Sequence, residues 1–152
     1  MLEPMLKVVI DTNLLVNGST DDYSFANRII DEVIAAKIIA YANHATLREN
    51  KLLTDTKVRD TEYLKKMQNF FSVVNEVARA SQLIDIVEDP DDNKLVESAA
   101  VAKADYLISS DRHLLKLEQY LDTKIVSPEN FWNIYEEESG TGWQDWIGQF
   151  VK

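Results

Sequence analysis

Short apolar runs alternate along this chain with longer segments in which apolar residues recur periodically. Short, mostly apolar runs are typical of buried strands, whereas apolar residues that recur every three or four positions indicate amphipathic helices. The short runs predict strands at residues 7–10, 38–41, 83–87, 106–109 and 124–126. The periodic segments predict helices at residues 25–34, 43–53, 56–80, 95–102, 112–120 and 128–135.

Capping residues support several of these helices. Small polar side chains accept hydrogen bonds from the first free N–H groups of a helix, and proline fits its first position. The longest predicted helix, residues 56–80, would bury Leu64, Met67, Phe71, Val74 and Val77. The residues expected to begin other helices are Asp21 or Asp22, Asp91 or Asp92 after a turn at Pro90, and Ser127 followed by Pro128.

Strands that alternate with helices predict an α/β fold. Its sheet should be mainly parallel, with about five strands and helices on both faces. A chain of 152 residues with 45% hydrophobic content is long and apolar enough for one domain with a substantial core. We expect this domain at residues 5–138, followed by a glycine-hinged tail at residues 139–152.

The amino-acid composition excludes several kinds of functional site and bears on the protein's location and partners. The chain has no cysteine, which excludes disulfides, zinc–thiolate sites and thiol catalysis. It has neither an apolar run near 18 residues nor a charged-then-apolar leader, so we expect a cytoplasmic protein without membrane contact. The net charge of −10 is unusual for a protein that binds nucleic acid. Basic residues are frequent only between Arg48 and Lys66, where a modest basic face or an ordinary solvated helix surface is expected.

Four separated carboxylates are the strongest candidates for a functional site. They are Asp11, Glu49, Asp92 and Asp111, and three of them stand at predicted strand-to-helix corners. A parallel sheet gathers the ends of its strands at one edge, where ligands bind. Carboxylates there repel one another unless a hard cation holds them, and oxygen ligands suit Mg²⁺ or Mn²⁺.

Each of these acids also has a plainer interpretation. Asp11, Asp92 and Asp111 could serve only as helix caps. Glu49 could be a surface acid paired with Arg48 or Lys51. Arg112, next to Asp111, could contact a substrate phosphate or remain an ordinary surface residue. The two histidines, His44 and His113, are expected to be packed or surface residues.

Four motifs together resemble the PIN domain family. They are Val-Val-Ile-Asp-Thr-Asn at 8–13, Thr-Leu-Arg-Glu-Asn-Lys-Leu-Leu at 46–53, Asp-Pro-Asp-Asp-Asn-Lys at 89–94 and Ala-Asp-Tyr-Leu-Ile-Ser-Ser-Asp-Arg-His-Leu-Leu at 104–115. The chain is most similar to the branch that contains toxins of toxin–antitoxin systems. This resemblance implies a three-layer α/β/α nuclease fold and an endoribonuclease that depends on Mg²⁺ or Mn²⁺.

The resemblance also assigns roles to residues. It implies that Asp11, Glu49, Asp92 and Asp111 are catalytic metal ligands, with Asp91 as a substitute or helper for Asp92. Thr12, Asn13 and Ser109 match small polar positions that orient the acids or a water. Arg48 and Arg112 are the candidate substrate-binding residues. The implied partners are an RNA substrate and an antitoxin protein, with a homodimer as a further expectation.

Two other functions are also to be considered for this sequence. Haloacid-dehalogenase-like phosphatases carry a second aspartate two residues after the first, but here that residue is Asn13, and the lysine and acidic pair of receiver domains are not evident. A PIN-fold module that acts mainly by binding a partner is the second alternative. It is favoured by the acidic charge and by a tail whose apolar residues share one helical face, namely Trp143, Trp146, Ile147 and Phe150.

Overall fold

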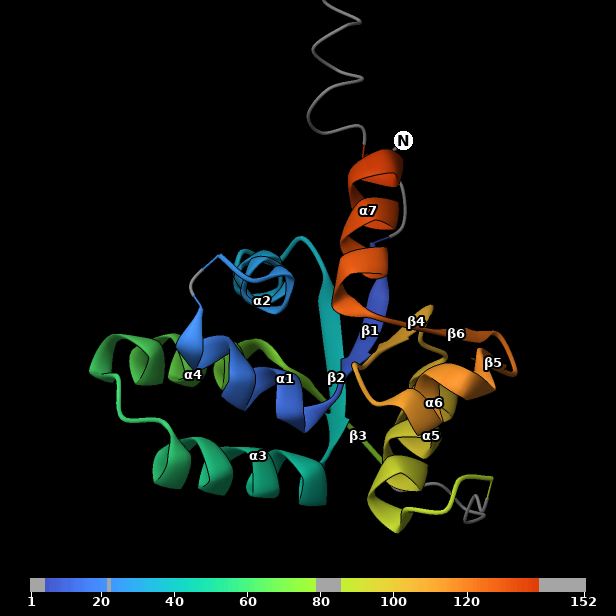
Figure 1. Cartoon of the computed structure of the whole chain (residues 1–152), viewed down its shortest axis with the longest axis horizontal. Helices are drawn as coiled ribbons and strands as arrows, with labels where there is room; N and C mark the ends of the chain where they lie inside the picture. The colour runs from blue at the N-terminus through green and yellow to red at the C-terminus, as the bar shows by residue number, and fades with distance from the viewer. Residues whose placement is uncertain (1–4, 22, 79–85, 140–152) are drawn as a thin grey trace, which may run out of the picture.

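The computed structural model describes residues 5–21, 23–78 and 86–139. Within these residues, six strands form one sheet in the order β3-β2-β1-β4-β6-β5, and all neighbours are parallel except β5 and β6 (Figure 1). The sheet therefore has one strand more than the sequence predicts. The strands are β1 (Lys7–Ile10), β2 (Ile39–Asn43), β3 (Asn75–Val77), β4 (Tyr106–Ile108), β5 (Gln119–Tyr120) and β6 (Thr123–Val126).

Helices cover both faces of the sheet. In Figure 1, α1 to α4 lie on one side of β1 and β2, and α5 and α6 lie on the other. The helices are α1 (Thr12–Asn17), α2 (Phe25–Ile34), α3 (His44–Lys57), α4 (Thr61–Val73), α5 (Pro90–Ala102), α6 (Arg112–Leu117) and α7 (Pro128–Ser139), and a short 3-10 helix spans Gly18–Thr20. The predicted three-layer α/β/α fold is confirmed.

The alternating side chains of β1 explain the three layers. Val8 and Ile10 belong to a core cluster with residues of α1, α2, α4 and α7, such as the fully buried Phe131. Val9 points to the opposite face and packs in a second cluster with α5 and α6, including Leu107 and Leu114. Successive residues of a strand face opposite sides, so a continuous apolar run suits a strand that is buried on both faces.

Two helix caps differ from the prediction. Ser24, not Asp21, caps α2, and its hydroxyl accepts a hydrogen bond from the Asn27 N–H at 3.1 Å. Asp22 lies outside the described residues. The cap of α5 is Asp89, because Pro90 takes the first helical position and Asp91 and Asp92 follow within the first turn.

The segment after β2 shows the largest correction. Over residues 56–78, the predicted helix 56–80 is instead the end of α3, a break at residues 58–60, then α4 and the edge strand β3. Residues 79 and 80 lie outside the described residues. Asp60 causes the restart, since its carboxylate accepts hydrogen bonds from the N–H groups of Glu62 and Tyr63. Val77, predicted on the helix stripe, lies in β3 and pairs with Asn43.

One strand prediction and one helix prediction also need correction. Of the strand predicted at 83–87, residues 83–85 lie outside the described residues, and Ile86 and Val87 form a bend. The helix predicted at 112–120 stops at Leu117, because Glu118 takes a positive φ of 63° and the chain turns into β5. The predicted tail, apart from Ser139 at the end of α7, also lies outside the described residues.

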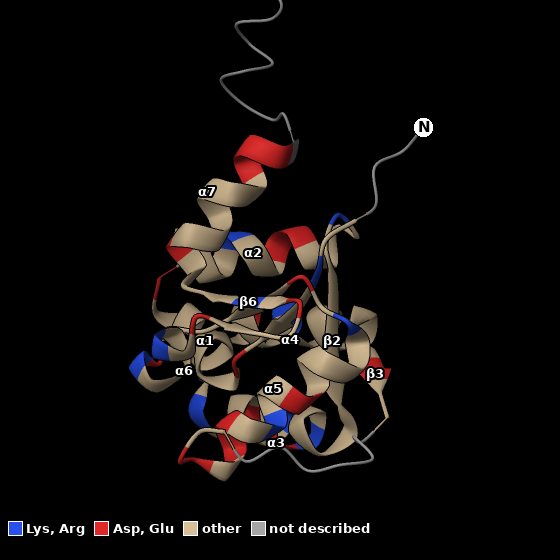
Figure 2. Cartoon of the chain, turned by 90° about the vertical axis from the view of Figure 1, so that its right-hand side faces the viewer, with Lys and Arg blue, Asp and Glu red and all other residues tan. Residues whose placement is uncertain are grey.

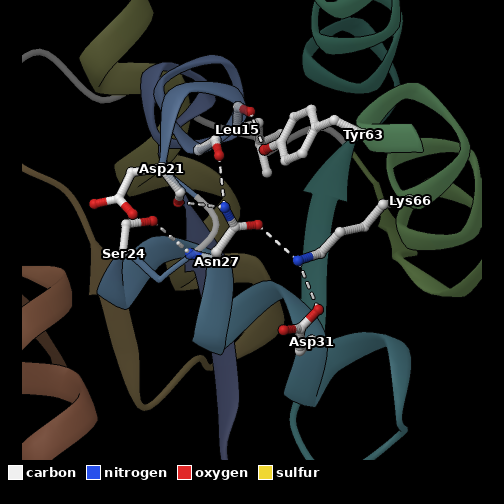
Figure 3. A network of polar contacts seen from close by, with 8 residues as sticks. Leu15, Asp21, Ser24, Asn27, Asp31, Tyr63 and Lys66 are labelled. Carbon is white, nitrogen blue, oxygen red and sulfur yellow. Dashed lines mark hydrogen bonds and ion pairs between the residues drawn. The ribbon is translucent and has the colours of Figure 1, made fainter. Parts of the chain in front are cut away.

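A buried polar network fixes α1 and the loop after it against α2 and α4 (Figure 3). The fully buried Asn27 donates hydrogen bonds to the carbonyls of Gly18 (2.5 Å) and Asp21 (2.7 Å). The side-chain carbonyl of Asn27 accepts from the Lys66 ammonium at 2.6 Å, and the Tyr63 hydroxyl donates to the backbone carbonyl of Leu15. The network therefore holds the carboxyl end of α1, the helix that Asp11 caps.

Asn27→Ala is expected to lower the free energy of unfolding by about 2–4 kcal/mol. The change leaves the buried Gly18 carbonyl and the partly buried Asp21 carbonyl without their donor, and each such loss costs about 1–3 kcal/mol. Denaturant unfolding of the variant beside Asn69→Ala, an exposed asparagine on α4, measures the effect. If the two variants unfold at the same midpoint, the network does not stabilise this fold.

Candidate active site

The four predicted acids line one cavity at the carboxyl edge of the sheet. Asp11 follows β1, Asp111 follows β4, Asp92 lies in the first turn of α5, and Glu49 lies on α3. The structure thus brings together residues that are up to 100 positions apart, and their chemical role remains a prediction. The cavity has a volume of about 160 Å³ and is lined by Asp11, Thr12, Asn13, Thr46, Glu49, Leu53, Asp89, Asp91, Asp92, Lys94, Leu95 and Asp111.

Helix caps and a serine hold two of the acids in place. Asp11 is 5% exposed; its carboxylate caps α1 by accepting from the Asn13 N–H at 3.2 Å. The buried Ser109 hydroxyl donates to the other Asp11 oxygen at 2.7 Å and accepts from the Asp111 N–H at 3.0 Å. Asp111 in turn caps α6 through the His113 N–H at 2.8 Å. The capping interpretation is therefore correct for Asp11 and Asp111, and both caps also face the cavity.

The structure distinguishes the two neighbouring aspartates of α5. Asp92 is only 8% exposed, whereas the side chain of Asp91 is 73% exposed. Asp91 is also paired with the Lys94 ammonium at 3.5 Å. Asp92 is therefore the better candidate for the inward acid, and Asp91 stands at the rim.

Burial, reinforced by neighbouring negative charges, raises the pKa values of two of these acids. Burial is the main cause of the raised pKa of Asp11, reinforced by Asp111 and Asp89 and opposed by the hydrogen bonds from Ser109 and Asn13. Burial, followed by the charges of Asp111, Asp89, Asp11 and Asp91, raises the pKa of Asp92 to about 6. The ionised forms of Asp11 and Asp92 are therefore costly without a counter-cation.

Lys94 is a cavity residue that the sequence reasoning did not select. Its ammonium lies 3.9 Å from Glu49 and 3.5 Å from Asp91, and so links α3 to the start of α5. Figure 2 shows acidic and basic residues together where α3 and α5 meet. A lysine three residues after an aspartate on a predicted helix was an available signal for the ion pair.

The remaining candidates lie outside this cavity. Arg48 and Arg112 are exposed, and neither lines the cavity, so their contact with a phosphate remains a prediction. His113 is exposed and lies 3.4 Å from Asp111. His44 is exposed and pairs with Glu76 at 2.7 Å.

The donor set fits a hard divalent cation. Carboxylates from four segments supply only oxygen ligands, which Mg²⁺ and Mn²⁺ prefer. The raised pKa values of Asp11 and Asp92 reflect burial first and unbalanced negative charge second. Over residues 5–21, 23–78 and 86–139, however, no three acidic or histidine side chains are already arranged to hold one ion.

Comparison with known proteins decides the family. The sequence model described as a PIN domain matches residues 7–113, which includes all four acids of the cavity. The chain belongs to the PIN domain family. PIN domains are generally nucleases that use divalent metals, so this membership argues against the phosphatase-like and receiver-like alternatives.

Sequence similarity to curated proteins is weaker. An uncharacterized protein of Methanocaldococcus jannaschii is 27% identical to this PIN domain protein over 146 residues, covering 87% of this chain and 93% of the relative. No solved structure gives a significant match. Within the described part of this PIN domain protein, no helix is both long and apolar enough to cross a membrane.

Asp92→Asn is expected to stabilise the metal-free PIN domain at pH 7.5 by about 1–3 kcal/mol. The folded protein keeps the Asp92 proton up to a pKa of about 6, whereas the unfolded chain releases it near 3.8. Between these values the folded state binds more protons, so its stability falls as the pH rises. The asparagine variant lacks this loss, and its advantage should shrink at pH 4.5.

Thermal unfolding in EDTA at both pH values tests this expectation. Asp122→Asn, which removes an exposed aspartate from the turn between β5 and β6, is the matched control and should show no such change. An Asp92→Asn variant that is no more stable than wild type at pH 7.5 would show that neither burial nor the neighbouring carboxylates disfavour the charged form of Asp92 in the folded protein.

Proposed function

We propose that this PIN domain protein is an endoribonuclease that depends on Mg²⁺ or Mn²⁺ and acts as the toxin of a toxin–antitoxin pair. The observation that carries the proposal is the single cavity lined by Asp11, Glu49, Asp92 and Asp111 at the carboxyl edge of the sheet. Family membership supports nuclease chemistry. The choice of RNA and of a toxin role rests on the resemblance of the four sequence motifs to the toxin branch.

The cavity residues have distinct tasks in this proposal. Asp11, Asp92, Asp111 and Glu49 supply the oxygen atoms that hold the cation. When bound, such an ion polarises a phosphate and lowers the pKa of a water molecule that attacks it. Ser109 keeps Asp11 oriented by its 2.7 Å hydrogen bond. Lys94, at the rim, offers an ammonium group to a phosphate oxygen of the substrate.

Cleavage of a panel of folded and unfolded RNAs tests the proposed activity. Purified protein should cut at least one RNA with Mg²⁺ or Mn²⁺, and EDTA should stop the reaction. Single-stranded DNA of the same sequence is the matched substrate and should be cut more slowly. If no RNA is cut with either metal, the nuclease proposal is wrong; equal cleavage of DNA would contradict the preference for RNA.

A partner-binding role is the second candidate. The net charge of −10 favours it, because repulsion weakens contact with a polyanion. The proposed antitoxin and a second copy of the chain are the partners to consider. Expression of wild type and Asp11→Asn in a bacterial host separates the two roles. Growth arrest by wild type alone supports a nuclease toxin, whereas arrest by both supports binding.

A further inference from the structure

A second, larger cavity lies beside the carboxylate cavity. It has a volume of about 630 Å³ and is formed by the carboxyl ends of β2 and β3, the start of α3 and one side of α5. We call it the edge cavity; the residues that matter here are Asn43, His44, Ala45, Glu76, Val77 and Lys94. Cavities of roughly 300–1,000 Å³ commonly hold small organic ligands.

Lys94 forms part of the wall of both cavities. It stands on α5, one turn after Pro90, and its ammonium reaches Glu49 and Asp91 on the carboxylate side. A ligand whose anionic group lies near Lys94 would therefore place its neighbouring parts in the two cavities. A nucleic-acid strand has this alternation, because each phosphate is flanked by two nucleosides.

The walls of the edge cavity suit a nucleobase. Ala45 and Val77 supply apolar surface. The His44 imidazole is held by its Nδ1 contact with Glu76 at 2.7 Å, and no other residue of the described ranges pairs with its Nε2. Asn43 also lines the cavity, and its side-chain carbonyl caps α3 by accepting from the Thr46 N–H at 2.7 Å. Histidine rings stack on bases, and amide groups bond to base edges.

One wall is braced independently of any ligand. The side-chain carbonyl of Asn93 accepts hydrogen bonds from the backbone N–H groups of Ile86 and Val87, both at 3.1 Å. Its side-chain amide donates to the Val87 carbonyl at 2.9 Å. All three bonds link α5 to the bend before it. Asn93 therefore shapes the cavity, and the residues that could contact a bound base lie on β2, β3 and α3.

We propose that the edge cavity binds the base of the RNA nucleotide next to the scissile phosphate, with Lys94 contacting the phosphate between the two cavities. This inference rests on the proposed ribonuclease function and adds the source of its sequence preference. The base would lie against Ala45 and Val77, with its polar edge toward His44 and Asn43.

Ala45→Trp is the variant that fills the cavity. Ala45 is exposed in the first turn of α3, so the larger side chain should be tolerated by the fold. Leu52→Trp, at a position of the same helix that is 65% exposed and borders neither cavity, is the matched control. Both variants should melt within a few degrees of wild type, which excludes loss of folding as an explanation.

The test combines these variants with RNAs that carry one abasic ribose at successive positions around the cleavage site. For wild type and Leu52→Trp, one position next to the cut should lower kcat/KM about tenfold or more when its base is missing. For Ala45→Trp, the intact RNA should already be cut about tenfold more slowly, and the abasic change should have little further effect. Equal abasic effects in all three proteins would overturn the inference while leaving the ribonuclease function intact.

A binding measurement in EDTA tests the same cavity without cleavage. The four 5′-nucleoside monophosphates are titrated separately into labelled protein. At least one should shift the amide NMR signals of residues 43–45 and 76–78 in wild type and Leu52→Trp, but not in Ala45→Trp. If all four leave these signals unchanged at millimolar concentration, the edge cavity does not bind a base. This result is independent of whether the protein cuts RNA.

Discussion

Asp11→Asn is expected to reduce metal-dependent RNA cleavage by at least about 1,000-fold while preserving the fold. Asparagine has nearly the same shape but is neutral and a poorer ligand for a hard cation. A loss of several kcal/mol in transition-state stabilisation corresponds to this factor, since each 1.36 kcal/mol is tenfold in rate. The melting temperature in EDTA should not fall, because the substitution removes a carboxylate whose charged form is disfavoured by burial, the main cause of the raised pKa of Asp11.

Single-turnover cleavage in Mn²⁺ measures this effect, with wild type and Asp11→Asn purified in parallel. Asp122→Asn, on the turn between β5 and β6, controls for the chemistry of the substitution and should keep full activity. Unchanged cleavage by a folded Asp11→Asn preparation would place the activity elsewhere or reveal a contaminating nuclease.

Millimolar Mn²⁺ is expected to raise the melting temperature of wild type by roughly 5–10 °C at pH 7.5. A ligand at 100 times its Kd stabilises the folded state by about 2.7 kcal/mol. For a chain of this size, each kcal/mol raises the melting temperature by about 2–4 °C. The acids that carry the effect are those whose mutual repulsion the ion relieves, foremost Asp11 and Asp92.

Asp92→Asn and Asp11→Asn should each lose most of this shift, whereas Asp122→Asn should keep it. The same scans with high NaCl in place of Mn²⁺ separate binding of one ion from general screening of the net charge of −10. A melting temperature that does not respond to Mn²⁺, or responds equally in all four proteins, would rule out this cavity as the metal site.

The parts of the fold that sequence predicts well are those fixed by local pattern. The apolar run at β1 must be buried on both faces, and Asp11 directly after it caps α1. Pro128 and Ser127 likewise define the start of α7, where the Ser127 hydroxyl accepts from the Asn130 N–H. Because parallel strands end at one edge, these corners also predict that Asp11 and Asp111 face the same cavity.

The features that sequence does not predict depend on distant contacts. The three residues of β3 have exposed or half-buried side chains and show no strand pattern, so only their pairing with β2 makes them a strand. The break before α4 requires the Asp60 cap and the burial of Val58. The sequence does not identify Lys94 as a cavity residue, because its ion pair across the cavity is with Glu49, which is 45 positions away in the sequence.

The choice between Asp91 and Asp92 illustrates the same limit at the site. Both carboxylates precede the apolar stripe of α5, and either could cap a helix. The true cap, Asp89, shifts both into the first turn, where the helix rotates Asp92 inward and leaves Asp91 beside Lys94. Which of the two aspartates is buried thus depends on where α5 begins. An error of one residue in the predicted first residue of the helix is enough to exchange them.

Anomalous X-ray scattering from crystals grown with MnCl₂ shows whether the gathered carboxylates hold the cation for phosphodiester hydrolysis. We expect a manganese peak in the carboxylate cavity, with oxygen atoms of Asp11 and at least one of Asp92 and Asp111 at about 2.0–2.3 Å. A cavity without a peak at saturating Mn²⁺, or manganese bound only at other surfaces, would contradict it.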